Sequence, residues 1–332
     1  MRISLKKTAL GSILFAGALL AVAVTVEAQQ PAKIPRIGFL AALSLSVYSA
    51  RLDAFRQGLH ELGYVEAKNI VIEFRSADGK SERLPGLAAE LVRLPVDVIV
   101  TAGPTSSRAA KEATVTLPIV MAMDTDPVGS GFIANLARPG GNITGLSTLA
   151  QEISGKQLEL LKETMPRLSR VAALRTSSVP GNAQELKEIE VSAKSLGVKV
   201  QYLDILDSKD IDTAFAAASK GRADAILVGT SRVLFSNRIK VTELAERYRL
   251  PAIYIEQEFV DVGGLMTYAT SIGDLYRRAA IYVDKILKGA KPADLPVEQP
   301  KKFELIINLK AAKQIGLTIP PNVLARTDKV IK

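Results

Sequence analysis

Short apolar stretches of strand length alternate with amphipathic stretches of helix length along most of this chain. In the first half, we expect strands at residues 34–40, 69–75, 96–101 and 118–123, and helices at 48–62, 81–94 and 105–114. In the second half, we expect strands at 170–174, 198–204, 225–229, 252–256 and 303–308, and helices at 154–165, 183–196, 210–220, 237–248 and 272–288. Strands that alternate with helices predict parallel sheets with crossover helices, which is an α/β fold.

The segments between these elements carry the connections of the fold. We expect a loop and a helix at residues 124–138, an extended crossing into the second half at 142–147, a crossing back at 263–268, a Pro-rich linker at 291–300, and at most a short helix beyond Pro321. Crossings of this kind between the two halves would form a hinge.

Passages of the first half return in the same order in the second half, each roughly 130 residues downstream. They pair residues 36–40 (RIGFL) with 170–174 (RVAAL), 61–63 (ELG) with 195–197 (SLG), 96–100 (VDVIV) with 223–227 (ADAIL), and 117–120 (LPIV) with 250–253 (LPAI). The spacing is far longer than that of a solenoid repeat, so it predicts two similar lobes.

We therefore expect two Rossmann-like lobes with parallel sheets, joined by a multi-strand hinge. The N-terminal lobe would comprise residues 29–146 and about 265–290, and the C-terminal lobe residues 147–264 and about 300–332. Sheets of this class bind ligands beyond the carboxyl ends of their strands. The cleft between the lobes is therefore the expected ligand site.

The first residues, 1–28, have the composition of a secretory signal peptide. Arg2, Lys6 and Lys7 precede an apolar stretch at 9–26, and a small-residue cleavage site follows. An uncleaved membrane anchor is the alternative, because about 17 apolar residues can span a bilayer. The chain has no Cys, which excludes a lipid-modified N-terminal Cys. We expect a free periplasmic protein.

Composition bounds the class of protein. The 332 residues are 48% hydrophobic, enough for a globular core, and carry a formal net charge of +9. Lys and Arg are scattered without long runs, which indicates a solvated basic surface and not a nucleic-acid-binding patch. A repressor of related fold is disfavoured, because a signal peptide occupies the place of its DNA-binding segment. No nucleic acid is expected as a partner.

Residues for catalysis are scarce. His60 is the only histidine and lies in an expected helix, and without Cys a Cys/His or thiolate–metal site is excluded. The chain has no Gly-x-Ser-x-Gly elbow, no dinucleotide fingerprint and no P-loop. A Ser/Lys or carboxylate-only enzyme remains open, but we expect a protein that is not an enzyme and has no cofactor.

Polar residues follow the expected strands of the first lobe. Gly103, Thr105 and Ser106 come after the third expected strand and open a helix. Free N–H groups and the helix dipole favour an anion there, such as a carboxylate, although plain N-capping explains the same residues. Ser44 and Ser46 follow the first strand in the same way.

Asp124 and Asp126 follow the fourth expected strand at a spacing that a metal ion could use. Three interpretations stay open for this pair: capping of the next helix by Asp126, with Pro127 at its first position; contact with a ligand ammonium; and metal coordination. Capping is favoured, and no metal site is assigned.

In the second lobe, polar residues occupy the equivalent strand ends: Ser177, Thr230, Ser231, Glu256 and Gln257. With the hydroxyls of the first lobe they predict a cleft suited to a small zwitterion. Hydroxyls would donate to a carboxylate, and Asp126 or Glu256 would accept from an ammonium. Tyr48, Phe235 and Phe259 would either form an apolar wall or pack in the core.

Longer motifs resemble the exported substrate-binding proteins of ABC importers, in the family that includes tryptophan- and tyrosine-type binding proteins. The motifs are RIGFL at residues 36–40, FRQGL at 55–59 with LGY at 62–64, DVIV at 97–100, DPVG at 126–129 followed by LARPGGNITG at 136–145, GGLMTY at 263–268 and FELIINLK at 303–310. The resemblance covers residues 34–331.

This resemblance implies a type I periplasmic binding protein fold, in which two lobes close on one ligand. It also implies a monomer that delivers its ligand to an ABC permease in the inner membrane, with Thr105 and Ser106 holding a ligand carboxylate. One departure concerns the loop after the first strand of the second lobe, where relatives often carry Asn-Pro and this chain has RTSS at 175–178. Because that lobe sets specificity, an aromatic amino acid is only the first candidate ligand.

The sequence thus predicts the periplasmic solute-binding component of an ABC importer, which captures a small carboxylate-bearing ligand, with an aromatic amino acid as first candidate. A ligand-sensing protein of the same fold that serves a signalling receptor is one alternative. An exported enzyme is the other, and it would require a cluster of titratable residues in the cleft.

Overall fold

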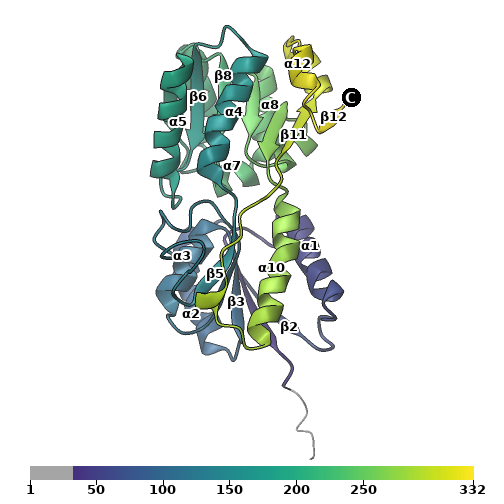
Figure 1. Ribbon diagram of the computed structural model, residues 1–332. Coiled ribbons are helices and arrows are strands. Elements are labelled where there is room, and N and C mark those ends of the chain that lie inside the picture. Colours follow the sequence, from purple (N-terminus) through teal and green to yellow (C-terminus); the bar gives the residue numbers. More distant parts are fainter. Residues whose placement is uncertain (1–32) are drawn as a thin grey trace, which may run out of the picture. The chain divides into compact units, whose positions relative to one another are not determined.

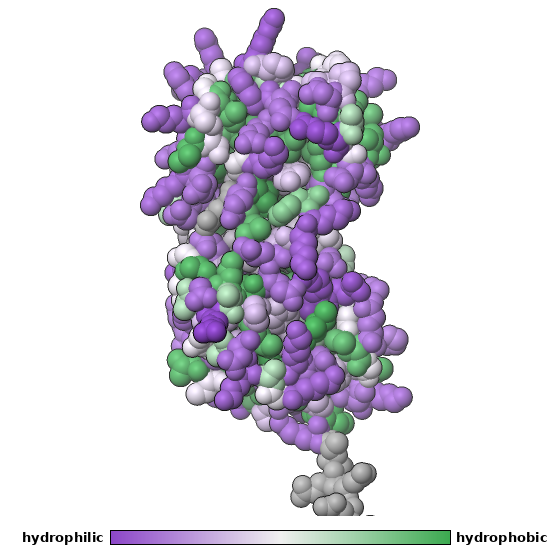
Figure 2. Space-filling view, in the orientation of Figure 1, coloured by the Kyte–Doolittle hydropathy of each residue, from purple (hydrophilic) through white to green (hydrophobic). Residues whose placement is uncertain are grey.

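The computed structural model describes residues 33–332, so the predicted signal peptide at 1–28 lies outside the described residues. Residues Ile34–Lys332 form one compact unit that contains two β-sheets. No helix within 33–332 combines the length and hydrophobicity that crossing a bilayer requires. In Figure 2, hydrophilic residues cover most of the visible face of this unit, with hydrophobic residues between them in small groups.

The first sheet has five parallel strands in the order β2-β1-β3-β4-β5. They are β1 (Arg36–Ala41), β2 (Val71–Ser76), β3 (Val98–Ala102), β4 (Ile119–Asp124) and β5 (Ile143–Ser147). Helices cover both faces, which is why the central strands are apolar throughout. One face carries α1 (Ser49–Glu61) and α10 (Ile272–Leu287), and the other carries α2 (Leu84–Arg93), with a preceding 3₁₀ turn (Ser81–Arg83), and α3 (Pro104–Ala113) (Figure 1). We call this sheet and its helices the first lobe.

The second sheet has seven strands in the order β12-β11-β10-β9-β8-β6-β7, of which β10 and β11 are antiparallel neighbours. They are β6 (Arg170–Arg175), β7 (Lys199–Asp204), β8 (Ala225–Val228), β9 (Ala252–Tyr254), β10 (Met266–Ala269), β11 (Glu304–Asn308) and β12 (Lys329–Ile331). One face packs against α4 (Ala150–Thr164), α5 (Asn182–Leu196), α11 (Leu309–Ile315) and α12 (Pro321–Leu324). The other packs against α6 (Asp210–Lys220), α7 (Arg232–Ser236), α8 (Arg238–Arg247) and α9 (Glu258–Asp261). This is the second lobe.

The two lobes repeat one design, because the order β7-β6-β8-β9-β10 matches β2-β1-β3-β4-β5. Two aspartates explain part of the repeated sequence. The Asp97 carboxylate accepts a hydrogen bond from the backbone N–H of Arg36 (2.8 Å), and Asp224 accepts one from that of Arg170 (2.9 Å). Each aspartate thereby ties the start of β3 or β8 to the first strand of its lobe. The prediction of an α/β fold with two Rossmann-like lobes is confirmed.

The helix expected within residues 124–138 is absent, and these residues form turns. The Asp126 carboxylate accepts a hydrogen bond from the Gly129 N–H (2.8 Å), and the Asp126 carbonyl accepts one from the Ser130 N–H (2.9 Å). Gly131 then adopts a φ of +70°, which stops helical continuation after one turn. The helix prediction was wrong, and Asp126 caps a turn.

Residues 142–147 and 263–268, both expected to cross between the lobes, contribute strands β5 and β10 to the two sheets. An extended apolar segment has the same pattern in a strand and in a crossing, so only the pairing with neighbouring strands, β4 for β5 and β9 and β11 for β10, distinguishes the two. The chain crosses just after these strands, at 148–149 and 270–271. The segment beyond Pro321, expected to be at most a short helix, also forms β12 beside β11.

The chain crosses once more between α10 and β11, and this crossing lies beside β5. The Ser147 N–H donates to the Glu298 carbonyl (2.9 Å), and the Glu298 N–H donates to the Gly145 carbonyl (3.0 Å). A 3₁₀ turn (Pro292–Asp294) precedes it. The crossings therefore form a narrow set of extended segments, which is the arrangement of a hinge.

Gly58 should be indispensable for the packing of α1 on α10. A Cβ atom at this position would lie 2.2 Å from the Arg277 carbonyl oxygen in α10. Gly58→Ala should therefore separate the helices and lower the free energy of unfolding by about 1–3 kcal/mol, measured by urea denaturation. The matched control is Gly86→Ala in α2, where nothing lies within 4 Å and alanine should stabilise by about 0.5–1 kcal/mol. Equal effects of the two substitutions would contradict the close approach.

Candidate functional site

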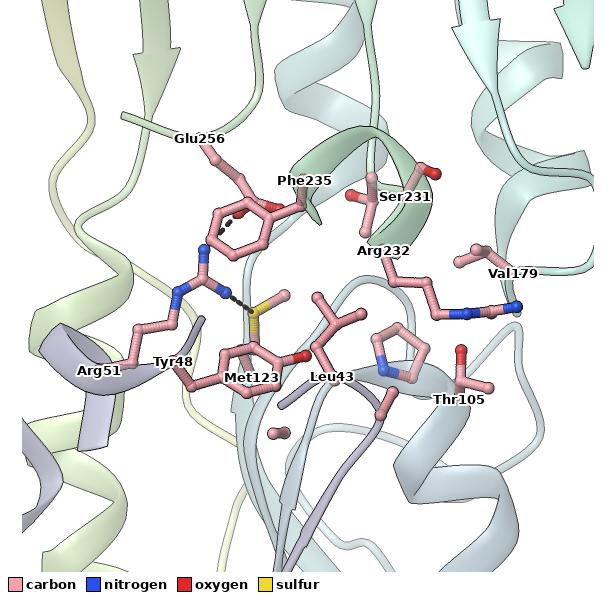
Figure 3. A pocket seen from close by; sticks show the side chains of 15 residues that line it. Leu43, Tyr48, Arg51, Thr105, Met123, Val179, Ser231, Arg232, Phe235 and Glu256 are labelled. Atoms are coloured by element: carbon pink, nitrogen blue, oxygen red, sulfur yellow. Dashed lines mark hydrogen bonds and ion pairs between the residues drawn. The ribbon is translucent and has the colours of Figure 1, made fainter. Parts of the chain in front are cut away.

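A cavity of about 50 Å³ lies between the lobes, where the carboxyl ends of strands from both sheets meet (Figure 3). Its lining comes from the first lobe at Ala42, Leu43, Tyr48, Arg51, Ala102, Gly103, Pro104, Thr105 and Met123, and from the second at Val179, Thr230, Ser231, Arg232, Phe235 and Glu256. Pockets that hold small molecules measure about 300–1,000 Å³. A ligand of amino-acid size therefore requires the lobes to separate before it can enter.

A buried ionic cluster joins the lobes beside this cavity. Arg51, on α1 of the first lobe, is 5% exposed and forms an ion pair with Glu256 and a second one with Glu258 (2.7 Å), both in the second lobe. Its Nε also donates to the Glu258 carboxylate (2.9 Å). Burial alone lowers the pKa of Arg51, but the two carboxylates raise it by more. Arg51 is therefore charged, and its counter-charges belong to the opposite lobe.

Aromatic rings hold the Arg51 guanidinium in place. The Arg51 Cζ lies 4.2 Å from the centroid of the Phe235 ring and 5.7 Å from that of Tyr48. Those two rings come from different lobes and stack with centroids 6.4 Å apart. Burial raises the pKa of Tyr48 to about 12, so its hydroxyl stays neutral. Tyr48 and Phe235 thus form an apolar wall, one of the two roles expected from the sequence. Phe259 packs against Phe235, with ring centroids 6.3 Å apart.

Hydrogen-bond donors face the cavity from both lobes. Thr105 lies at the start of α3, directly after Pro104, and is half-buried. Across the cavity, Arg232 begins α7, whose first turn is capped by the Ser231 hydroxyl accepting from the Leu234 N–H (3.2 Å). Within residues 33–332, no hydrogen bond or ion pair engages the half-buried Arg232 guanidinium, and burial lowers the pKa of this group. In Figure 3 its side chain extends to the side of the cavity where Thr105 and Val179 lie.

The predicted site residues divide into two sets. The structure brings to the cavity Gly103, Thr105, Thr230, Ser231 and Glu256. Outside the lining lie Ser44, Ser46, Ser106, Asp124, Asp126, Ser177 and Gln257. The first two bond to each other (3.0 Å) on a loop, Ser106 is fully buried, and Ser177 is exposed.

Two charged residues of the cavity were not predicted. Arg51 lies on the buried stripe of α1 with Leu52 and Phe55, so a basic residue at an apolar position of the helix was the available signal. Arg232 follows Thr230 and Ser231 directly and belongs to the same strand end. The distant partners of Arg51 had no signal in the sequence.

The RTSS segment at 175–178 does not place Arg175 in the cavity. Arg175 is fully buried in the second lobe and pairs with Glu185 of α5 (2.5 Å) and the Ser154 hydroxyl of α4 (3.2 Å). Thr176 bonds to Ser231 (2.5 Å) and so supports the loop that carries Arg232. Thr176 therefore supports a residue of the cavity lining, and neither Arg175 nor Thr176 belongs to the lining itself.

Asp124 is buried at the end of β4, next to the first crossing between the lobes. Its Oδ1 accepts a hydrogen bond from the Asp126 N–H (3.2 Å), whereas its Oδ2 has no hydrogen-bond partner. Burial raises the pKa of Asp124 from 3.8 to about 7. Among the described residues, no group of three or more His, Cys, Asp or Glu is arranged to hold a metal ion. The carboxyl of Asp124 is therefore best described as a buried acid.

Ionisation of Asp124 should cost stability as the pH rises. The unfolded chain loses this proton near pH 4 and the folded chain near pH 7, so the free energy of unfolding falls across that interval. Asp124→Asn should remove this loss, on the order of 3 kcal/mol between about pH 5 and about pH 8, in urea denaturation series. Asp53→Asn, at an exposed position of α1, is the control that should keep the loss. An unchanged pH dependence in Asp124→Asn would contradict the assignment.

Breaking the ionic cluster should be costly, because a buried carboxylate loses its counter-charge. Arg51→Met should lower the free energy of unfolding by about 3–5 kcal/mol. The control is Arg56→Met on the same helix, where Arg56 forms an exposed pair with Glu66 (2.8 Å) that should contribute less than about 1 kcal/mol. Adding Glu256→Gln to Arg51→Met should recover part of the loss. Urea denaturation measures all these variants, and equal losses in the two methionine variants would refute the cluster's role.

Known proteins share this architecture. A tyrosine-binding protein of Clostridioides difficile is 27% identical over 263 residues, which cover 79% of this chain and 75% of that protein. A solved conserved domain protein from Vibrio cholerae is 28% identical, with a TM-score of 0.85 and coverage of 90% of this chain and 100% of the other. An ABC domain from Streptococcus pneumoniae, solved in complex with L-Trp, is also 28% identical, with a TM-score of 0.84 and coverage of 90% and 99%.

The family model described as ABC transporter substrate binding protein matches residues 36–331, which include both sheets and every residue that lines the cavity. The predicted resemblance is thereby confirmed, and the chain belongs to the family of ABC transporter substrate-binding proteins.

Proposed function

We propose that this protein is the periplasmic solute-binding component of an ABC importer, and that it captures a small carboxylate-bearing ligand in the cavity between its lobes. The observation that carries this proposal is the pair of donors on opposite walls. Thr105 and the backbone N–H groups at the start of α3 belong to the first lobe. Arg232, which has no hydrogen bond or ion pair within the described residues, belongs to the second. A carboxylate between them would accept hydrogen bonds from both lobes.

Such a ligand would favour closure, because contacts with both walls exist only when the lobes are together. Binding would start on one lobe of a separated form, and the second lobe would then close over the ligand. The crossings beside β5 would serve as the hinge. A permease in the inner membrane would receive the ligand from the closed form, with the binding protein acting as a monomer. The signal-like composition of residues 1–28 supports a place in the periplasm.

Relatives indicate which ligands to test first. One similar protein is named for binding tyrosine, and one similar structure holds L-Trp. The apolar wall of Tyr48 and Phe235 offers this chain a surface for a ring or a branched side chain. Aromatic and branched compounds with a carboxylate are therefore the first candidates, and amino acids lead among them.

Thermal unfolding against a panel of amino acids and small organic acids tests this proposal. A ligand at 100 times its Kd should stabilise the protein by about 2.7 kcal/mol and raise its Tm. Thr105→Val should weaken binding of that ligand about tenfold or more, because a hydrogen bond to a charged group is lost. Thr116→Val, the same change at an exposed position beyond the far end of α3, should leave binding unchanged. The absence of any stabilising carboxylate in the panel would refute the proposal.

A further inference from the structure

The charged groups of the cavity define which polar groups a ligand can carry. Only Arg51, Arg232 and Glu256 contribute charge to the described lining, so the lining carries one net positive charge. Its single carboxylate is therefore the one negatively charged group in the described lining that could pair with a ligand ammonium. Whether Glu256 is free to do so decides between two classes of ligand, amino acids and simple organic acids.

Glu256 is not free. Its carboxylate is 8% exposed and already forms an ion pair with the Arg51 guanidinium. Arg51 is held in turn by Glu258 and by the faces of Phe235 and Tyr48, so it cannot leave without breaking a second ion pair and two cation–π contacts. When the lobes close over a ligand, its ammonium would therefore have to compete with this protein cation for the Glu256 carboxylate.

Other carboxylates near the site do not replace Glu256. Glu258 pairs with Arg51, and Asp124 and Asp126 lie outside the lining. Asp124 is also buried at the end of β4, and burial raises the pKa of its carboxyl to about 7. Glu82, whose charge acts on Arg232 from a distance, is exposed on the 3₁₀ turn before α2.

The remaining polar side chains at the cavity are a cation and neutral hydroxyls. Within the described residues the Arg232 guanidinium forms no hydrogen bond or ion pair, Thr105 presents a hydroxyl, and the amino end of α3 presents backbone N–H groups. In an amino acid the ammonium is one carbon away from the carboxylate. A carboxylate held by Arg232 and α3 would therefore bring its own ammonium within a few ångströms of a guanidinium and of the positive end of a helix dipole.

We propose that the cavity selects a carboxylate that has no ammonium beside it, namely an organic acid with an aromatic or branched apolar body. Arg232 is the residue that sets this preference, because it binds the carboxylate and repels an adjacent ammonium. The apolar body lies against Tyr48 and Phe235, with Leu43 and Val179 completing the wall. This inference rests on the proposed function, and it replaces amino acids with acids that lack the ammonium as the leading ligand class.

Matched pairs of ligands that differ only in the ammonium test the inference. Isothermal titration calorimetry of the purified chain would compare hydrocinnamate with L-phenylalanine, and phloretate with L-tyrosine. The deaminated member of a pair should bind about tenfold or more tightly than the amino acid. The neutral amide of hydrocinnamate, which lacks the carboxylate, should bind weakly.

The outcomes separate this inference from the proposed function. Tighter binding of the deaminated acids supports both. Equal or tighter binding of the amino acids overturns the inference and leaves a carboxylate-binding protein in place. If neither member of any pair binds, the aromatic carboxylate class fails for the proposed function and the inference fails with it.

Two arginine variants show which side chain sets the preference. Arg232→Gln should raise the Kd of hydrocinnamate about tenfold or more. It should also bring the Kd values of hydrocinnamate and L-phenylalanine closer together, because the repulsion of the ammonium is lost. Arg238→Gln is the matched control: Arg238 contacts the Phe235 ring at 5.2 Å but does not line the cavity, so the ratio should stay unchanged. A merely structural role of Arg232 would weaken both ligands equally, and that result would overturn its assignment.

Discussion

The Arg51 cluster is the constraint on which the site depends. The Arg51 guanidinium of the first lobe is buried, and both carboxylates that pair with it, Glu256 and Glu258, belong to the second lobe. A buried charge without a partner would cost several kcal/mol, on the order of 3–5. The closed arrangement of the lobes is therefore tied to an ion pair that forms across the cleft, and separation of the lobes requires water to solvate all three groups.

The same contact fixes the character of the cavity. Because the Arg51 guanidinium lies against the Phe235 and Tyr48 rings, one edge of the small cavity is a protein cation. Because Glu256 is paired, the charged group still available to a ligand in the described lining is the Arg232 guanidinium. The interaction that holds the lobes together thus also decides which charge the site can accept. A change at Arg51 would alter closure, cavity size and ligand class at once.

Much of the fold follows from the sequence because its signals are local. Strand and helix patterns, the repeated aspartates Asp97 and Asp224, and the similar order of elements in both halves all appear within short windows. The errors arose where a local pattern has two structural solutions. Residues 142–147 and 263–268 have the same pattern in a crossing and in a strand, and residues 127–138 lack the regular apolar spacing that distinguishes a helix from successive turns.

The site was harder to predict because its chemistry depends on distant partners. Strand-end position correctly placed Thr105, Thr230 and Glu256 at the cavity, since parallel strands deliver their carboxyl ends to one edge. The role expected for Glu256, to accept a ligand ammonium, assumes a free carboxylate. Its partner Arg51 lies more than two hundred residues earlier in the chain, and only the fold brings the two together. Sequence position therefore indicates which residues face a ligand. The ion pairs that form in the folded protein determine which of these residues still have a charge available for binding.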